Sequence, residues 1–238
     1  MTEVSRLAVM QPYFFPAASY FQLVYAVDSF VFYDDVSYIK QGWINRNRLQ
    51  QAGKELLFSV PVAQNSHTAF IRDIGTSGYG RWKTKFLKTL VSCYASAPYF
   101  EPVYDLVADV VRPDRTHIAD LAMDSVIATS RYLGLTAEFS RSSIFSPETR
   151  GIGQTERLLA LCHKANASVY INTIGGRDLY KVDEFLKHNI VLKFLSSEFP
   201  NYKQSPGTFV GRLSIIDVMM YMSPDMIKAS LPLYDLIS

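Results

Sequence analysis

The chain opens with apolar and polar positions that predict a strand, a helix and a second strand. A short apolar run at residues 5–10 stops before Pro12 and predicts a buried strand. From Ser19, the expected N-cap, apolar residues recur every three or four positions and predict a helix. Residues 30–36, FVFYDDV, predict another strand. This order is a βαβ unit, which implies a parallel sheet with a right-handed crossover.

The rest of the chain predicts more helices and strands. We expect a turn at Gly53, a strand at ELLFSVPV and a polar stretch with little strand as far as Gly80. Thr116 should cap a helix that Gly134 ends. Helices are expected at 81–95, 100–111, 116–133 and 154–166 and in KVDEFLKHN and LSIIDVMMYM, strands in SVYINTIGG and IVLKFLS, and a loop at 140–153.

These elements together predict the α/β fold class, with a parallel-sheet core that the βαβ unit opens and a helical insertion at about 81–135. We find neither an internal repeat nor a charge block or low-complexity linker, and therefore predict a single domain over residues 1–238. The alternative is a domain boundary near Gly80.

Composition gives no support to several classes of protein, although it does not exclude a nucleic-acid partner. The net charge of +2, from 24 Lys and Arg against 22 Asp and Glu, gives no global reason to expect a nucleic-acid partner. No run reaches the roughly 20 apolar residues of a membrane span. Pro12 and Pro16 interrupt the N-terminal apolar run, so a signal peptide is not expected. Cys93 and Cys162 lack metal-ligand spacing, which favours a reduced, cytoplasmic protein.

The densest group of polar side chains follows the second predicted strand, in YDDVSYIKQGWINRNR. In parallel sheets, ligands bind outside the carboxyl ends of the strands, where this segment and the one after the first strand both emerge. Lys and Arg suit anions, so we predict an anion or nucleotide-sugar pocket. The alternative is a solvated hairpin with Trp43 as its packing anchor. The group comprises Asp34, Asp35, Lys40, Trp43, Asn45, Arg46, Asn47 and Arg48.

Three further segments are candidates for binding. In MQPYFFPAASY, two prolines fix a turn before a helix whose first N–H groups favour an anion, although the turn could be purely structural. In YINTIGGRDLY, Gly175 and Gly176 would let the backbone approach a ligand, or form an ordinary turn. In YKQSPGTFVGRLSIIDVM, Ser214 and Asp217 favour a helix capping box.

Familiar catalytic and metal motifs are absent from the sequence. We find no GxxxxGK[ST], GxGxxG after the first strand, HExxH or GxSxG. The four histidines are scattered, and none has a partner at metal-ligand spacing. We therefore predict no structural metal.

The motifs together resemble the WbqC-like protein family. The resemblance runs nearly end to end, through QPYFFP, the long segment from YFQLVY to NRNR, PYF, the serine pair at 142–143, YINTIGG, YKQ and LSIID. The matching residues are Gln11, Pro12, Pro16, Tyr20, Asp28, Asp34, Asp35, Lys40, Trp43, Asn45, Arg46, Asn47, Arg48, Asn172, Gly175, Gly176, Tyr202, Gln204 and Asp217. The chain departs from relatives at Ser19, where glycine is common, and at Phe86, where a histidine often follows WxxK.

The layout of the opening unit also has a distant similarity to nucleotidylyl transferases. The (H/T)xGH signature, which holds a nucleotide's phosphates in those enzymes, falls here on residues 17–20, AASY. The similarity therefore does not extend to adenylyl transfer by that signature.

The family resemblance implies a role in O-antigen or related surface-polysaccharide synthesis, for which glycine transfer has been proposed. Our hypothesis is an aminoacyl transferase acting on a nucleotide-linked amino sugar, with no tightly bound cofactor. Aminoacyl-tRNA or an ATP-derived adenylate would be the donor. A base and oxyanion donors are needed. We assign catalysis to Asp34 or Asp35 with Asn45 and Asn47, and substrate binding to Gln11, Pro12, Tyr13, Tyr20, Lys40, Trp43, Arg46, Arg48, Asn172, Gly175, Gly176, Tyr202 and Gln204.

Two alternatives belong to other classes. One is an ATP-using nucleotidyl transferase or ligase-like enzyme, which should need Mg²⁺ and release pyrophosphate. The other is a non-catalytic protein that binds a sugar nucleotide without turnover.

Overall fold

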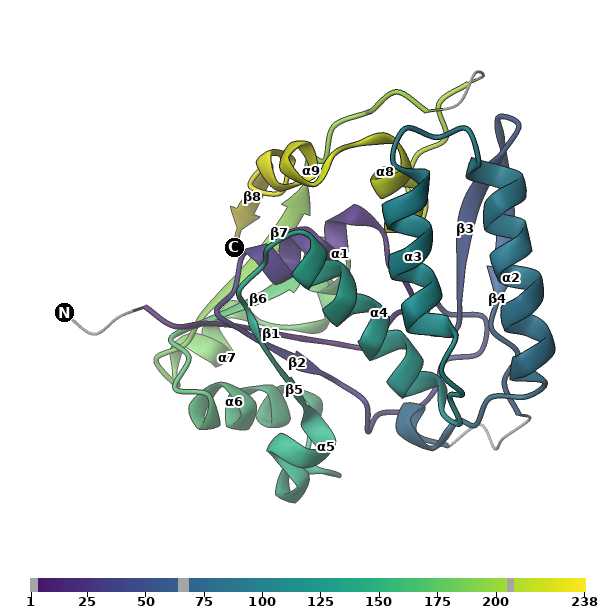
Figure 1. Cartoon of the computed structure of the whole chain (residues 1–238). Helices are drawn as coiled ribbons and strands as arrows, with labels where there is room; N and C mark the ends of the chain where they lie inside the picture. The colour runs from purple at the N-terminus through teal and green to yellow at the C-terminus, as the bar shows by residue number, and fades with distance from the viewer. Residues whose placement is uncertain (1–3, 64–68, 205–207) are drawn as a thin grey trace.

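A computed structural model describes residues 4–63, 69–204 and 208–238. Its centre is a six-stranded sheet in the order β5-β2-β1-β6-β7-β8 (Figure 1). These strands are β1 (Arg6–Met10), β2 (Ser29–Phe32), β5 (Glu138–Arg141), β6 (Val169–Thr173), β7 (Val191–Ser197) and β8 (Tyr234–Ile237). A separate antiparallel hairpin consists of β3 (Arg46–Gln51) and β4 (Lys54–Ser59).

The central sheet is mostly parallel, which confirms the predicted α/β class. Strand β1 pairs in parallel with β2 and with β6, and only the pairing of β7 with β8 is antiparallel. From β1 the chain first extends the sheet towards β2 and β5, and then returns to add β6 and β7 on the other side of β1. The direction of winding therefore reverses between β1 and β6, which creates a topological switch point at their carboxyl ends.

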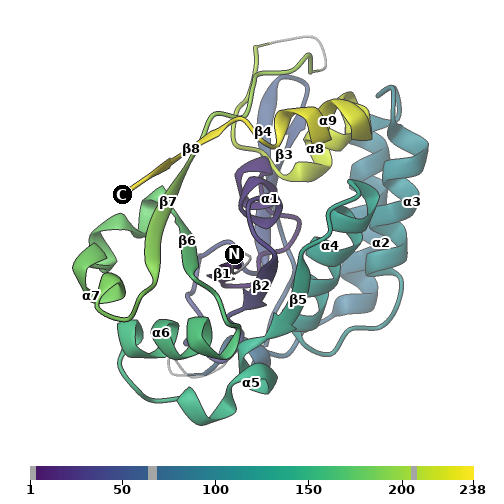
Figure 2. The same cartoon turned by 90° about the vertical axis from the view of Figure 1, so that its left-hand side faces the viewer.

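Two apolar layers cover the two faces of this sheet. Because side chains alternate along a strand, Ala8 of β1 packs in the larger core with α1, α3 and α4, whereas Leu7 and Val9 pack in a smaller core with α6 and α7. Figure 2 shows α6 and α7 on one side of the sheet and α1 and α4 on the other. The helices are α1 (Ala18–Tyr25), α2 (Tyr79–Tyr94), α3 (Phe100–Val111), α4 (Ile118–Tyr132), α5 (Ser142–Phe145), α6 (Gln154–Lys164), α7 (Val182–Leu186), α8 (Ile215–Tyr221) and α9 (Pro224–Ser230).

Most predicted elements are present, but two helix caps are wrong. Helix α1 begins at Ala18, and its N-cap is Ala17 rather than Ser19, because the chain leaves Pro16 in an extended conformation only as far as Ala17. Helix α4 has His117 as its N-cap, and the Thr116 hydroxyl contacts the His117 ring instead of a backbone N–H. Gly134 follows α4 in the left-handed region, with φ +65°, as expected for a residue that ends a helix.

Several weakly patterned elements were not predicted. The segment 140–153, expected to be loop, contains the end of β5, helix α5 and a 3-10 turn at Pro147–Thr149. Strand β3, helix α9 and strand β8 were also missed, and β2 ends at Phe32 rather than at 36. The single-domain organisation stays a prediction. Across the described parts of the chain, every helix is too short or too polar to cross a lipid bilayer.

Candidate functional site

A cavity of about 770 Å³ opens at the switch point of the sheet. Its walls come from the segments that follow β1, β2 and β6, together with the start of α6. This is where open α/β sheets bind ligands. We call this cavity the crevice; the residues that matter most below are Gln11, Tyr13, Tyr33, Asp35, Arg150, Arg157, Asn172 and Gly175.

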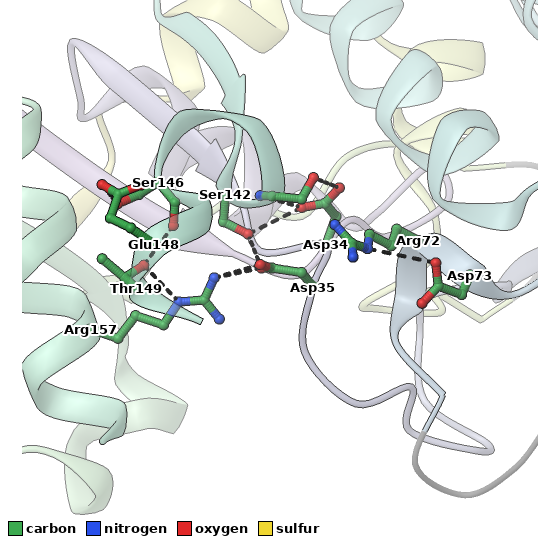
Figure 3. A network of polar contacts seen from close by, with 10 residues as sticks. Asp34, Asp35, Arg72, Asp73, Ser142, Ser146, Glu148, Thr149 and Arg157 are labelled. Atoms are coloured by element: carbon green, nitrogen blue, oxygen red, sulfur yellow. Dashed lines mark hydrogen bonds and ion pairs between the residues drawn. The ribbon is translucent and has the colours of Figure 1, made fainter. Parts of the chain in front are cut away.

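One wall of the crevice is a buried ion pair. Arg157 Nη2 lies 2.7 Å from both carboxylate oxygens of Asp35, and both side chains are almost wholly buried (Figure 3). The guanidinium also donates from Nε to Thr149 Oγ1 at 3.2 Å and lies 4.7 Å from the centre of the Tyr33 ring. Because a buried ion needs such partners, the pair fixes Asp35 and Arg157 in one orientation.

The neighbouring carboxylate of Asp34 faces away from the crevice. Its oxygens accept hydrogen bonds from the Ser143 backbone N–H at 3.0 Å and the Ser143 hydroxyl at 2.7 Å. The Ser142 hydroxyl donates to Asp35 at 2.5 Å and lies 3.1 Å from Asp34 (Figure 3). The first two residues of helix α5, Ser142 and Ser143, thus donate hydrogen bonds to the two carboxylates. Only Asp35 of the two predicted bases lines the crevice.

The turn after β1 is held by buried polar side chains from three other segments. The Phe15 carbonyl accepts hydrogen bonds from Asn47 Nδ2 and Ser214 Oγ, both at 2.7 Å, and the Phe15 N–H donates to Ser125 Oγ at 2.9 Å. Phe15 has φ 42°, a strained value for a residue other than glycine. These bonds stabilise the strained turn and so position Tyr13 at the crevice. Asn47, predicted to be catalytic, is committed to this clamp.

Tyr20 and Pro12, both predicted to bind substrate, are buried next to the same turn. The Tyr20 hydroxyl donates to the Gln11 carbonyl at 2.9 Å, and the rings of Tyr20 and Tyr13 have their centres 5.7 Å apart. Both Tyr20 and Pro12 are buried, whereas Gln11 and Tyr13 are partly exposed in the crevice.

The glycine pair after β6 forms the opposite wall. A Cβ on Gly176 would lie 2.9 Å from Asn172 Nδ2, so the glycine leaves room for the buried Asn172 side chain. Asn172 Oδ1 accepts a hydrogen bond from the Thr173 N–H at 2.8 Å. A Cβ on Gly175 would meet nothing within 4 Å, so the backbone there is open to a ligand.

The crevice is mildly positive and rich in hydroxyl groups. Among its described lining residues, Asp35 and Arg157 neutralise each other and Arg150 leaves one positive charge. Burial raises the pKa of Tyr13 and of Tyr33, where Arg157 only partly offsets it. Their hydroxyls therefore stay protonated at neutral pH and can donate hydrogen bonds. Aromatic surface, hydroxyls and a guanidinium suit an anionic ligand with a sugar-like part.

The predicted basic cluster lies on the hairpin, outside the crevice. Arg46 and Arg48 place their guanidinium carbons 5.6 and 5.1 Å from the Trp43 ring, and Arg48 also bonds Glu55 at 2.9 Å. Asn45 Oδ1 accepts a hydrogen bond from the Tyr38 hydroxyl, and its Nδ2 donates to a β4-side carbonyl. Lys40 is exposed just before this cluster. These residues surround Trp43 on the hairpin rather than in the crevice, and their role in binding stays a prediction.

The last predicted group is a buried network behind the hairpin. The Asp217 carboxylate accepts hydrogen bonds from Tyr94 Oη at 2.8 Å, Tyr202 Oη at 2.6 Å and Gln204 Nε2 at 2.9 Å. Ser214 caps α8, since its Oγ accepts from the Ile216 N–H at 3.3 Å. The predicted capping box is nevertheless wrong, because Asp217 is used by this network. Burial raises the pKa of Asp217, although these hydrogen bonds oppose the rise.

Comparison of the sequence with known proteins shows the family to which this chain belongs. A model of the WbqC-like protein family matches residues 11–229, which includes nearly all of the chain and every described crevice residue except Val9 and Met10. The chain belongs to the WbqC-like family. A relative is the uncharacterized protein Rv1507c of Mycobacterium tuberculosis (strain ATCC 25618 / H37Rv), which is 28% identical over 233 residues, covering 94% of this chain and 98% of that protein. No solved structure matches the chain.

The structure adds several residues that our sequence analysis of this WbqC-like protein did not predict. Tyr33 lay within the predicted second strand. Because side chains alternate along a strand, its position next to the buried Phe32 was the available sign that Tyr33 points to the other face. Arg157 is buried inside α6, where a charged residue is expected to face solvent, and no sequence pattern indicated otherwise. The others are Ser142, Ser143, Arg150, Gln154 and Tyr180.

Metal-binding side chains do not gather in the described part of this WbqC-like chain. In residues 4–63, 69–204 and 208–238, no group of three or more His, Cys, Asp or Glu side chains is arranged to hold an ion. His67 lies outside the described residues.

Proposed function

We propose that this WbqC-like protein transfers a glycyl or similar aminoacyl group from an activated donor to an amino sugar carried by a nucleotide, in the cytoplasm. The observation that carries the proposal is the crevice itself. It is an aromatic, mildly positive cavity of about 770 Å³ at the switch point of a parallel sheet. A volume within the range of 300–1,000 Å³ typical of ligand pockets is large enough for a nucleotide sugar.

The acceptor's parts correspond to different walls. Arg150 and the open backbone at Gly175 suit the diphosphate, since guanidinium and backbone groups both bind phosphate oxygens. The rings and hydroxyls of Tyr13 and Tyr33 suit the sugar. The amino group of the sugar then lies near Asp35, where its ammonium form is attracted by the carboxylate.

Asp35 is the residue to which we assign proton acceptance. The ammonium first loses a proton to the Asp35 carboxylate, which leaves a lone pair on nitrogen. That nitrogen attacks the carbonyl carbon of the aminoacyl donor, a C–N bond forms, and the C–O bond to the donor breaks with its electron pair on the leaving oxygen. Asp35 can return its proton to that oxygen and then accept the second proton that the new amide nitrogen loses, so that the reaction releases one proton overall. Tyr33, which stays protonated, can donate to the developing oxyanion.

Arg157 has a positioning role in this scheme. Its two hydrogen bonds orient the Asp35 carboxylate, and Arg157 lies between Asp35 and the Tyr33 ring. Asn45 and Asn47 are not assigned to oxyanion stabilisation, because their amides bond the protein's own groups.

Binding tests the site before turnover is sought. Calorimetry should show that one amino-sugar nucleotide from a panel binds to the wild type, and that Arg150→Ala weakens binding by about 10-fold or more through loss of a charged hydrogen bond. Arg141→Ala is the matched control, because Arg141 is a partly exposed arginine that pairs with Asp120. Equal binding by Arg150→Ala and the wild type would place the nucleotide elsewhere.

The sheet order supports one alternative, a nucleotidyl transferase that uses ATP. Doubly wound sheets of this kind commonly bind nucleotides at the switch point. Such an enzyme would require Mg²⁺ and release pyrophosphate in the presence of ATP, which a colorimetric phosphate assay coupled to pyrophosphatase detects. A protein that only binds a sugar nucleotide would show neither pyrophosphate nor an aminoacylated product.

A further inference from the structure

Charge is unevenly distributed along the chain, although the whole carries only +2. Residues 36–100 contain nine Lys and Arg against two Asp and Glu, a local charge of +7, so the remaining residues together carry −5. The charge block that we did not recognise in the sequence is interrupted by apolar core residues. A basic region within a near-neutral chain is the electrostatic footprint of a polyanion partner.

Helix α2 carries one side of this basic region. Arg81, Lys85 and Lys88 recur at spacings of four and three residues, which places them on one helix face, and all three are exposed. Ser92 continues the same face and accepts a hydrogen bond from Gln51 Nε2 at 3.2 Å. Because Gln51 belongs to the hairpin, the basic stripe runs alongside β3 and β4 (Figure 1).

The hairpin extends the same basic surface. Lys54 is exposed and pairs across the hairpin with Gln51, so it lies next to the end of the α2 stripe. Arg46 and Arg48 flank the Trp43 ring, which is 39% exposed, on the other face of the hairpin. Side chains alternate along β3, and the face that packs on α2 is that of Asn47 and its partner Phe58, which contacts Phe86. An accessible tryptophan beside guanidinium groups provides stacking surface for bases as well as charge for phosphates. We call Lys54, Arg81, Lys85 and Lys88 the α2–hairpin surface.

Most of the basic side chains on this surface have no acidic neighbour to neutralise them. In the described chain, Arg81, Lys85 and Lys88 have no acidic partner within 4.0 Å, whereas Lys83, on another face of α2, pairs with Asp114 at 2.7 Å. Of the hairpin cations, Arg48 alone is paired, with Glu55. The uncompensated cations therefore remain available to a partner.

We infer that the α2–hairpin surface binds the backbone of an RNA, and that this RNA is the tRNA carrying the aminoacyl group. The inference rests on the proposed function and names its donor. A small adenylate would occupy the crevice alone and would have no use for cations along α2. The Trp43 ring and its two guanidinium groups, on the opposite face of the same hairpin, would give an RNA that crosses the hairpin a second, stacking contact, which favours nucleic acid over an acidic protein.

The test is a salt titration of RNA binding by fluorescence anisotropy, with labelled deacylated tRNA as the probe. The triple variant Arg81→Gln/Lys85→Gln/Lys88→Gln should bind about 10-fold or more weakly at about 0.1 M salt, and its log–log salt slope should be shallower by about 2 to 3. The control Arg131→Gln/Lys181→Gln/Lys187→Gln removes the same charge from exposed positions on α4 and beside α7, and should keep wild-type binding and slope.

Other outcomes separate this inference from the proposed function. Equal weakening in both triple variants, absence of tRNA binding, or tighter binding to vesicles of anionic phospholipid than to tRNA would overturn the RNA surface. Calorimetry of an amino-sugar nucleotide on the same triple variant reports on the crevice independently. If the protein binds the amino-sugar nucleotide but not tRNA, only the inference that tRNA is the aminoacyl donor is rejected. Retained tRNA binding without any crevice ligand would reject the proposed function.

Discussion

Arg157 and Asp35 are joined by two hydrogen bonds of 2.7 Å, although 122 residues separate them in the sequence. The pair connects helix α6 to the segment after β2, two elements that contribute different walls of the crevice. Its geometry therefore determines where the Asp35 carboxylate points in the crevice.

Removing Arg157 should strongly destabilise the protein. Arg157→Ala leaves the Asp35 carboxylate buried without its cation, which should lower the free energy of unfolding by about 3–5 kcal/mol. Chemical denaturation measures the change. The partly exposed pair of Arg141 and Asp120 is the comparison, for which Arg141→Ala should lower it by no more than about 1 kcal/mol. Similar losses in the two variants would contradict a special role for the buried pair.

The strained turn after β1 should depend on Asn47. Asn47→Ala removes the hydrogen bond to the Phe15 carbonyl and one to the Arg48 N–H, and should lower the free energy of unfolding by about 1–3 kcal/mol. Because the turn positions Tyr13, nucleotide-sugar affinity measured by calorimetry should fall as well. Asn45→Ala removes an amide from the hairpin base and should leave that affinity near wild type. Unchanged affinity in Asn47→Ala would show that the turn does not position the ligand.

The two adjacent glycines should respond differently to alanine. Gly176→Ala places a methyl group 2.9 Å from Asn172 Nδ2, so Asn172 must move and stability should fall by about 1–3 kcal/mol. Gly175→Ala meets no protein atom within 4 Å and should fold normally, but it should weaken ligand binding by narrowing the crevice. Thermal unfolding and calorimetry distinguish the two effects. Normal binding by Gly175→Ala would mean that the ligand does not approach this backbone.

Asp217 should make stability depend on pH. Burial raises its folded-state pKa above the unfolded value of about 3.9, so the native state binds the extra proton. Its stabilising contribution is therefore present below the unfolded pKa and is lost as pH rises through the folded pKa. The groups that face it are Tyr94, Cys93, Tyr202 and Gln204. Denaturation measured between about pH 4 and 8 should show a free energy of unfolding that declines with pH in the wild type but not in Asp217→Asn. Parallel curves would exclude the titration of Asp217.

Local pattern was enough to predict the opening of the fold. Strand β1 and helix α1 carry strong apolar periodicity, and the parallel-sheet rule then indicated that the segments after β1 and β2 converge. Strands β3 and β5 were missed because RNRLQQ and EFSR are polar. In β3, buried Asn47 and Gln50 occupy positions where apolar residues would have shown the alternation.

The site was only partly predictable for a related reason. Gln11, Asp35, Asn172 and Gly175 line the crevice because strand ends define where ligands bind. Arg48 is near Asp35 in sequence but on the hairpin, because the chain turns away after β2 and β3 pairs with β4. The contribution of Arg157 depends on a tertiary contact over 122 residues, which a local pattern does not contain.

Aminoacyl transfer in the crevice is tested most directly by asking whether the protein makes the proposed product. Purified protein is incubated with ¹⁴C-glycyl-tRNA and the amino-sugar nucleotide that binds in calorimetry, and mass spectrometry follows the sugar nucleotide. We predict a mass increase equal to one glycyl residue, formed at least about 100-fold more slowly by Asp35→Asn, which is the size typical for loss of a general base. An unmodified sugar nucleotide, or equal product from Asp35→Asn and the wild type, would contradict the assignment of this crevice and its carboxylate to aminoacyl transfer.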